Sequence, residues 1–107
     1  MTVFNVLRQI EAQPELHLGY DSEHRAAQLR RLEAVLHGYS LALSENAVDE
    51  PGLRFLRGFG DYVRSKGWKV GGIGPIVSIL DKSEDPGAAW QTFWRLVWEY
   101  EAALGGA

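Results

Sequence analysis

The chain has 107 residues, of which 46% are hydrophobic and 23% are charged, and its net charge at pH 7 is −3. This length and composition favour a single folded domain with its own core and argue against disorder. The absence of cysteine excludes a disulfide framework, a thiolate metal site and a cysteine nucleophile.

The first helix is predicted over residues 2–13, where Thr2 can cap the helix. The apolar residues Val3, Val6, Leu7 and Ile10 follow with helical spacing. Pro14 should end this helix, because the residue before a proline disfavours the helical region. We expect residues 15–21 to form an ordered loop that turns at Gly19.

The longest helix is predicted over residues 22–46, with Asp21 or Ser22 as its cap. Its apolar seam repeats at spacings of three and four residues, as in helical bundles: Leu29, Leu32, Leu36, Tyr39 and Leu43. Gly38 interrupts the seam and suggests a close crossing with another helix.

Two shorter helices are predicted next, over residues 53–66 and 73–80. Pro51 fits the start of the first and Pro75 the start of the second, since a proline at the first helical position does no harm. The glycine-rich residues 67–72 should break the chain between them.

The last helix pattern covers residues 88–104, with Asp85 as cap, Pro86 at the first helical position and Gly105-Gly106 as the end. Trp90, Trp94 and Trp98 recur every four residues on a wide apolar face. With no convincing strand pair, the sequence predicts an all-α fold of about five helices in a single domain, residues 1–107.

The aromatic face of this last helix permits two interpretations. The favoured one places the tryptophans in the core, where large apolar side chains normally lie. In the alternative, the line that contains Trp94 and Trp98 stays exposed and binds a partner, because aromatic residues are frequent in binding hot spots.

The charge is unevenly distributed, since residues 54–82 hold six basic and two acidic side chains between two acidic ends. Arg54, Arg57, Asp61 and Arg64 share one face of the 53–66 helix, and Lys66 and Lys69 follow it. The plain interpretation is a solvated face with a salt bridge from Asp61. The alternative is a patch that meets an acidic partner, and nucleic acid is not expected because the whole chain is acidic.

Catalytic and metal sites are not indicated by the sequence. Glu33, His37, Ser40 and Ser44 lie along one side of the 22–46 helix, but residues on one regular helix do not converge as a nucleophilic triad requires. The three histidines lack the spacing of helical metal sites. We therefore expect no metal, no cofactor and no enzymatic activity.

Residues 7–19 read Leu-Arg-Gln-Ile-Glu-Ala-Gln-Pro-Glu-Leu-His-Leu-Gly, and residues 32–39 read Leu-Glu-Ala-Val-Leu-His-Gly-Tyr. These segments resemble a group of small, mostly uncharacterised bacterial proteins with an Arg-Pro-x-Met-Tyr-Leu-Gly-like segment and a Leu-x-Gly-Tyr-like helix end. The aromatic, acidic residues 93–101 also resemble the last helix of that group. The chain departs from it at Gln13, Glu15 and His17. Some of these proteins resemble immunity partners of secreted toxins.

The leading expectation is therefore a non-enzymatic protein-interaction domain, with an immunity protein that neutralises a bacterial toxin as its most specific form. Its partner-binding residues would be Arg54, Arg57, Arg64, Trp94 and Trp98. One alternative is a small-molecule-binding domain or small enzyme with a pocket between the 22–46 and 86–104 helices, at His37 and Tyr39. Another is a structural homodimer. Because no apolar run reaches the length of a membrane span and no signal peptide is evident, we expect no membrane partner and a cytoplasmic location.

Overall fold

The computed structural model describes residues 2–106, and all regular structure among them is helical. The α-helices are α1 (Val3–Ala12), α2 (Pro14–Leu18), α3 (Arg25–Glu45), α4 (Phe55–Ser65), α5 (Pro75–Lys82) and α6 (Pro86–Gly106). Two 3₁₀ turns, η1 (Ser22–His24) and η2 (Pro51–Arg54), lead into α3 and α4. The predicted all-α fold in one compact unit is confirmed.

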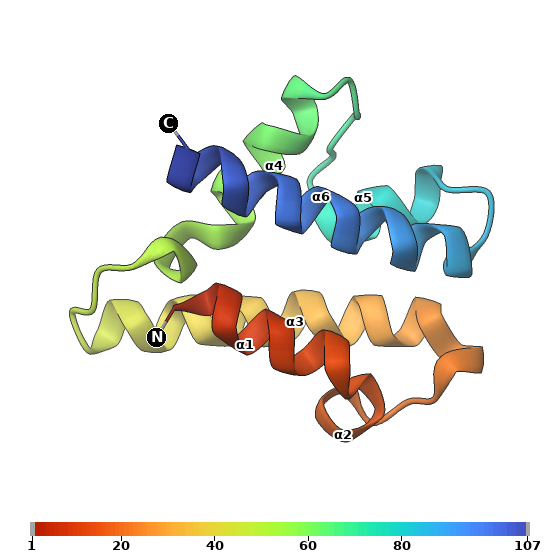
Figure 1. Cartoon of the computed structure of the whole chain (residues 1–107), viewed down its shortest axis with the longest axis horizontal. Helices are drawn as coiled ribbons and strands as arrows, with labels where there is room; N and C mark the ends of the chain where they lie inside the picture. The colour runs from red at the N-terminus through yellow and green to blue at the C-terminus, as the bar shows by residue number, and fades with distance from the viewer. Residues whose placement is uncertain (1, 107) are drawn as a thin grey trace.

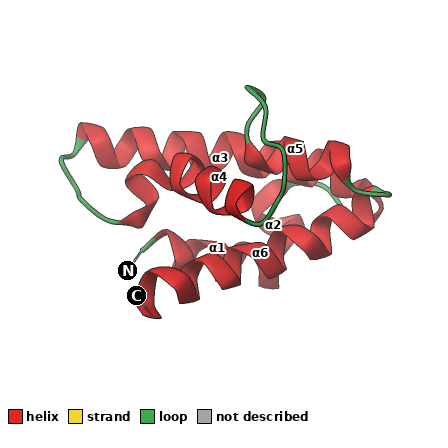
Figure 2. Cartoon of the chain, turned by 90° about the horizontal axis from the view of Figure 1, so that it is seen from above, coloured by secondary structure: helices red, strands yellow, loops and turns green. Residues whose placement is uncertain are grey.

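The two longest helices, α3 and α6, run lengthwise through the molecule in the same direction, and α1 runs opposite to them (Figures 1 and 2). The shorter α4 and α5 pack against both long helices. The start of α1 and the end of α6 lie at the same end of the molecule as the turn that follows α3, on the left of Figure 1. The helices therefore surround one shared core.

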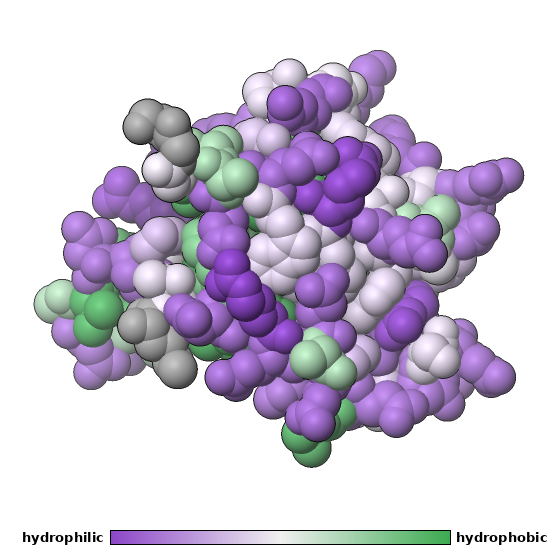
Figure 3. All heavy atoms as spheres, viewed as in Figure 1, coloured by the Kyte–Doolittle hydropathy of each residue, from purple (hydrophilic) through white to green (hydrophobic). Residues whose placement is uncertain are grey.

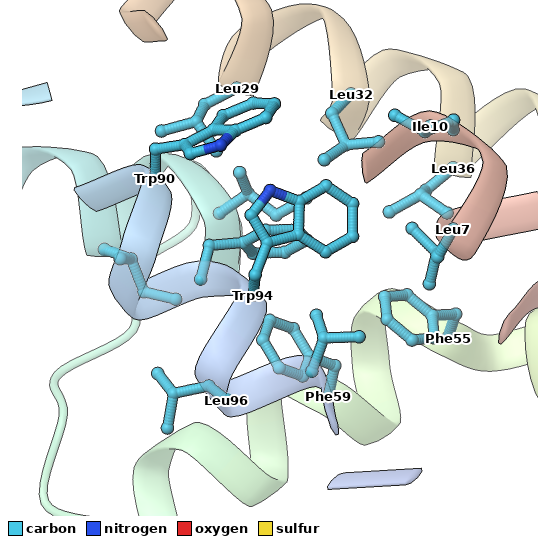
Figure 4. Packing of buried hydrophobic residues seen from close by; sticks show 14 of the residues in the cluster. Leu7, Ile10, Leu29, Leu32, Leu36, Phe55, Phe59, Trp90, Trp94 and Leu96 are labelled. Atoms are coloured by element: carbon cyan, nitrogen blue, oxygen red, sulfur yellow. The ribbon is translucent and has the colours of Figure 1, made fainter. Parts of the chain in front are cut away.

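The aromatic face of α6 is the centre of that core. Trp94 is only 4% exposed, and Phe93 and Val97 are fully buried. Figure 4 shows Trp94 among leucines of α1 and α3 and phenylalanines of α4. The core interpretation of the tryptophan helix is confirmed, and the expectation that Trp94 stays exposed is wrong, because helices on several sides cover the wide face.

The segment after Pro14 differs from its prediction. The sequence predicts a loop over residues 15–21, but α2 occupies Pro14–Leu18 and ends at Gly19, whose φ of +80° is left-handed. Pro14 thus ends α1 and also starts α2, as a proline at the first helical position permits. Leu18 is buried and Leu16 is exposed. The alternation of apolar residues in this segment therefore comes from a short helix that turns only Leu18 toward the core, and not from an extended strand.

Gly52 and Gly58 mark close approaches between elements, whereas Gly38 does not. A Cβ at Gly38 would have no heavy atom within 4 Å, so the predicted crossing there is wrong. A Cβ at Gly58 would collide with the Tyr100 hydroxyl. A Cβ at Gly52 would lie 2.5 Å from the Tyr39 ring. Gly58 therefore lets α4 approach α6, and Gly52 lets η2 approach α3.

Thr2 and Asp85 cap the first and last helices as predicted, whereas Asp21 caps the 3₁₀ turn η1 instead of α3, whose N-cap residue His24 makes no side-chain capping bond. The Thr2 side chain accepts a hydrogen bond from the backbone N–H of Phe4 and forms a capping box with Asn5. The Asp21 carboxylate accepts from the Glu23 N–H at 3.0 Å, and the Asp85 carboxylate accepts from the Ala88 N–H at 2.8 Å. These bonds satisfy backbone donors that a helix leaves free at its start.

Candidate functional site

The basic middle of the chain divides into two separate surfaces at the ends of α4. Arg54 and Arg57 lie at the start of this helix, and Lys66 and Lys69 follow its end. Eleven helical residues separate the ends by about 16 Å. Arg64 lines neither surface. Its guanidinium donates hydrogen bonds within the chain, to Asp61 at 3.1 Å and to the Val70 carbonyl at 3.3 Å.

The arginine pair borders two adjoining hollows of about 420 and 290 Å³ between α3 and the η2–α4 junction. We call them together the arginine groove, which is lined by the following residues: His37, Ser40, Leu41, Ser44, Leu53, Arg54, Leu56 and Arg57. Among residues 2–106, no carboxylate side chain lines either hollow. The groove is therefore a cationic surface with an apolar wall.

Hydrogen bonds fix the η2 turn, which carries Arg54, to α1 and α3. The Ser40 hydroxyl of α3 donates a hydrogen bond to the Leu53 carbonyl. The Glu50 carboxylate accepts from the Gly52 N–H at 2.6 Å and from the Val3 N–H of α1 at 3.2 Å. Because η2 is held to α1 and α3 in this way, Arg54 projects from a fixed backbone.

The charge of the arginine pair is not neutralised within the part of the chain that the structure describes. Neither Arg54 nor Arg57 takes part in any ion pair formed between residues 2–106. A larger groove of about 790 Å³ is also lined by both arginines, and Asp49, Glu50 and Asp61 contribute to its lining. The arginines thus border both a purely basic hollow and one of mixed charge.

An exposed leucine adds an apolar contact to the arginine groove. Leu41, which lies near the C-terminal end of α3, is 61% exposed. It falls outside the seam that faces the core, and nothing in the sequence pattern marks it or His37 as lining a groove with the arginines. On the face seen in Figure 3, hydrophobic side chains form separate spots rather than one broad patch. A small apolar anchor beside charge is consistent with a polar interface.

The two predicted tryptophans do not lie in this groove. Trp98 is half-buried, its indole N–H donates to Glu11 at 3.1 Å, and the Arg8 guanidinium lies 4.9 Å from its ring centroid. Trp94 packs against Trp98 with ring centroids 5.8 Å apart. Of the predicted partner-binding residues, the structure therefore brings together Arg54 and Arg57, while Arg64, Trp94 and Trp98 make contacts within the chain.

The polar side chains that line one side of α3 do not converge on one point. Glu33 turns inward, is 8% exposed and accepts from the Ile76 N–H at the start of α5 at 3.2 Å. His37 is exposed at the arginine groove, and the Ser40 hydroxyl bonds the Leu53 carbonyl. Burial raises the pKa of Glu33, and the backbone N–H groups of Ile76 and Val77 offset this only in part.

The alternative pocket between the 22–46 and 86–104 helices is occupied by the core. Leu29 and Leu32 of α3 and Trp90 and Trp94 of α6 fill that contact (Figure 4). Tyr39 lines neither hollow beside His37. Burial, assisted by the nearby Glu50 carboxylate, raises the Tyr39 pKa to about 12, so its phenol stays protonated at neutral pH.

Among residues 2–106, no three or more histidine, aspartate or glutamate side chains are grouped so that they could hold a metal ion. Within the same residues, no helix combines the length and the apolar character that crossing a membrane requires.

Comparisons of the chain with protein-family models, with curated proteins and with solved structures find no match. We therefore infer its function from the geometry of the arginine groove and from the features of the sequence.

Proposed function

We propose that this chain is a non-enzymatic helical domain that binds another protein through the arginine groove. The observation that carries the proposal is the pair Arg54 and Arg57, which is exposed, forms no ion pair within residues 2–106 and borders the groove that the exposed Leu41 also lines. Arginine is enriched in interface hot spots, where its planar fork binds carboxylates with two hydrogen bonds. The partner would present carboxylates with an apolar side chain beside them.

The most specific form of this proposal is an immunity role, in which the domain binds and blocks a toxin. It rests on the resemblance of residues 7–19 and 32–39 to small bacterial proteins, some of them similar to immunity proteins. A compact domain with a rigid cationic groove suits the task, since a preorganised surface loses little entropy on binding. An acidic toxin surface would supply the complementary charge.

A second copy of the chain is a weaker candidate for the partner. The homodimer that the sequence permits would rely on the tryptophan face, and Trp90 and Trp94 are buried within the chain itself. A homodimer through the arginine groove would bring Arg54 and Arg57 of two copies toward each other, and like charges repel.

The test is capture of binding proteins from a lysate of the source organism, with tagged wild-type protein and matched variants. Arg54→Glu and Leu41→Ser alter the groove. Arg30→Glu and Leu16→Ser make the same changes on exposed residues outside it, where Leu16 is 73% exposed. We expect a stoichiometric partner that both groove variants lose and both control variants retain.

Retention of the partner by both groove variants would show that this surface is not the binding site. For the immunity form, the captured protein is produced in cells with and without this chain. Growth arrest that wild-type protein relieves and Arg54→Glu does not relieve is the expected result, and a captured protein without toxicity contradicts the immunity role.

A further inference from the structure

A second basic groove, of about 410 Å³, lies at the other end of α4. It is lined by Lys66, Gly67, Trp68, Lys69 and Lys82, and we call it the lysine groove. Lys82 is the last residue of α5, so the fold brings it to the α4–α5 turn from a different element. Three lysine side chains and an indole therefore border one hollow, which no acidic side chain of residues 2–106 lines.

The charges of these lysines are not neutralised by ion pairs within residues 2–106. None of them takes part in an ion pair among residues 2–106, and the Lys66 ammonium lies 5.3 Å from the Tyr62 ring centroid. Cations are favourable at helix C-termini, which explains Lys66 and Lys82 individually. That effect does not explain Lys69, nor why all three border one hollow without a counter-charge.

The turn that carries the groove is held in place. The Trp68 N–H donates to the Val63 carbonyl at 3.3 Å, and Gly67 adopts a left-handed φ of +94°. The Arg64 guanidinium donates to the Val70 carbonyl at 3.3 Å, which fixes the chain beyond the groove to α4. Trp68 is half-buried against the core, so part of its indole forms a fixed wall.

We propose that the lysine groove binds the diphosphate group of a free nucleotide, with the base against Trp68. Linked phosphates carry the clustered negative charge that three ammonium groups complement, and lysine binds phosphate as a point charge. The indole beside them offers a surface on which a nucleotide base can stack, whichever base it is. This site is independent of the arginine groove and of the function proposed above.

The test follows the indole N–H signals of the full-length, ¹⁵N-labelled protein during titration with ADP. The chain has four tryptophans, and Trp68→Phe identifies the signal of Trp68. We expect ADP to shift this signal and to leave the buried Trp90 and Trp94 signals in place. The double variant K69Q/K82Q should weaken ADP binding by roughly tenfold or more, because it removes two of the three charges that contact phosphate.

Arg30→Gln is the charge control, since it removes an exposed basic side chain that lines neither groove. Inorganic pyrophosphate and adenosine test the two halves of the ligand, and each should bind more weakly than ADP. The proposal is overturned if ADP leaves the Trp68 signal unchanged, or if Arg30→Gln weakens binding as much as the lysine variant does. Equal affinity for pyrophosphate and ADP would overturn the placement of the base.

Discussion

Glu33 shows how a single buried side chain can hold a helix that has no cap of its own. Gly74 precedes α5 and has no side chain to offer, and the Ile76 N–H donates instead to the Glu33 carboxylate of α3. A Cβ at Gly74 would collide with that carboxylate, so glycine makes room for it. Burial raises the Glu33 pKa above its ordinary value of 4.5, because it disfavours the charged form. The positive N-terminus of α5 favours the charged form but only partly offsets this rise.

The raised pKa predicts how Glu33→Gln changes stability with pH. The folded protein holds the Glu33 proton more tightly than the unfolded chain, so the proton stabilises the fold at low pH. That contribution is complete below pH 4.5 and is lost as the pH rises through the raised pKa. Urea unfolding from pH 4 to 8 should show the wild-type protein losing stability relative to Glu33→Gln as pH increases. A difference that stays constant, or that favours wild type at higher pH, contradicts this assignment.

Glu33→Ala separates the charge from the hydrogen bond. Alanine removes the acceptor of the buried Ile76 N–H, whereas glutamine keeps a carbonyl oxygen in the same place. Leaving a buried donor unpaired costs about 1–3 kcal/mol, so Glu33→Ala should be less stable than Glu33→Gln by that amount. Because both variants are uncharged, this difference should not vary with pH.

Gly58 and Gly38, which both lie within helices, should respond oppositely to replacement by alanine. At Gly58 the added methyl group meets the Tyr100 hydroxyl, and overpacking of this kind costs about 1–3 kcal/mol. At Gly38, an interior position of α3, the methyl group would point into open space. Alanine is favoured over glycine within a helix by about 0.5–1 kcal/mol. Urea midpoints measure both changes. A stabilising Gly58→Ala would mean that Tyr100 moves aside at no cost.

At the scale of elements, the long helices could be predicted from the hydrophobic period and the capping residues, whereas α2 could not. The seam of α3 and the proline and aspartate signals before α6 lie in the local sequence, which is why their predicted positions are close to the observed ones. A helix of five residues is too short to display a period. Its existence depends on the burial of Leu18 against other elements, which the sequence pattern alone does not reveal.

Gly19 at the end of α2 provides a test of this short element. Its left-handed φ of +80° is easy for glycine but costs an L-residue about 1–2 kcal/mol. Gly19→Ala should therefore lower the free energy of unfolding by about that amount, as measured by urea denaturation. Gly71→Ala is the matched control, because Gly71 is also exposed and lacks a left-handed φ, and its effect should stay within about 0.5 kcal/mol. Similar losses in both variants would contradict the conformational explanation.

At the scale of the whole molecule, the candidate site was predictable where it depended on one helix face. Arg54 and Arg57 share a face of the predicted third helix, and they do border one groove. Arg64 shares that face, but the Val70 carbonyl of the following turn engages it. Leu41 and Lys82 could not be assigned to these surfaces from their spacing in the sequence. The packing of α3 and α5 against α4 places them there.

The separation of the two basic surfaces predicts that they act independently. The arginine pair and the lysine groove lie at opposite ends of α4, about 16 Å apart, which exceeds the screening length of about 8 Å at physiological ionic strength. Arg54→Glu should therefore change the affinity for ADP by less than about twofold, although it reverses a charge. The same titration in dilute buffer should show a larger effect, because the screening length there approaches about 30 Å. An Arg54→Glu effect at physiological salt as large as that of Lys69→Glu would mean that the two surfaces form a single site.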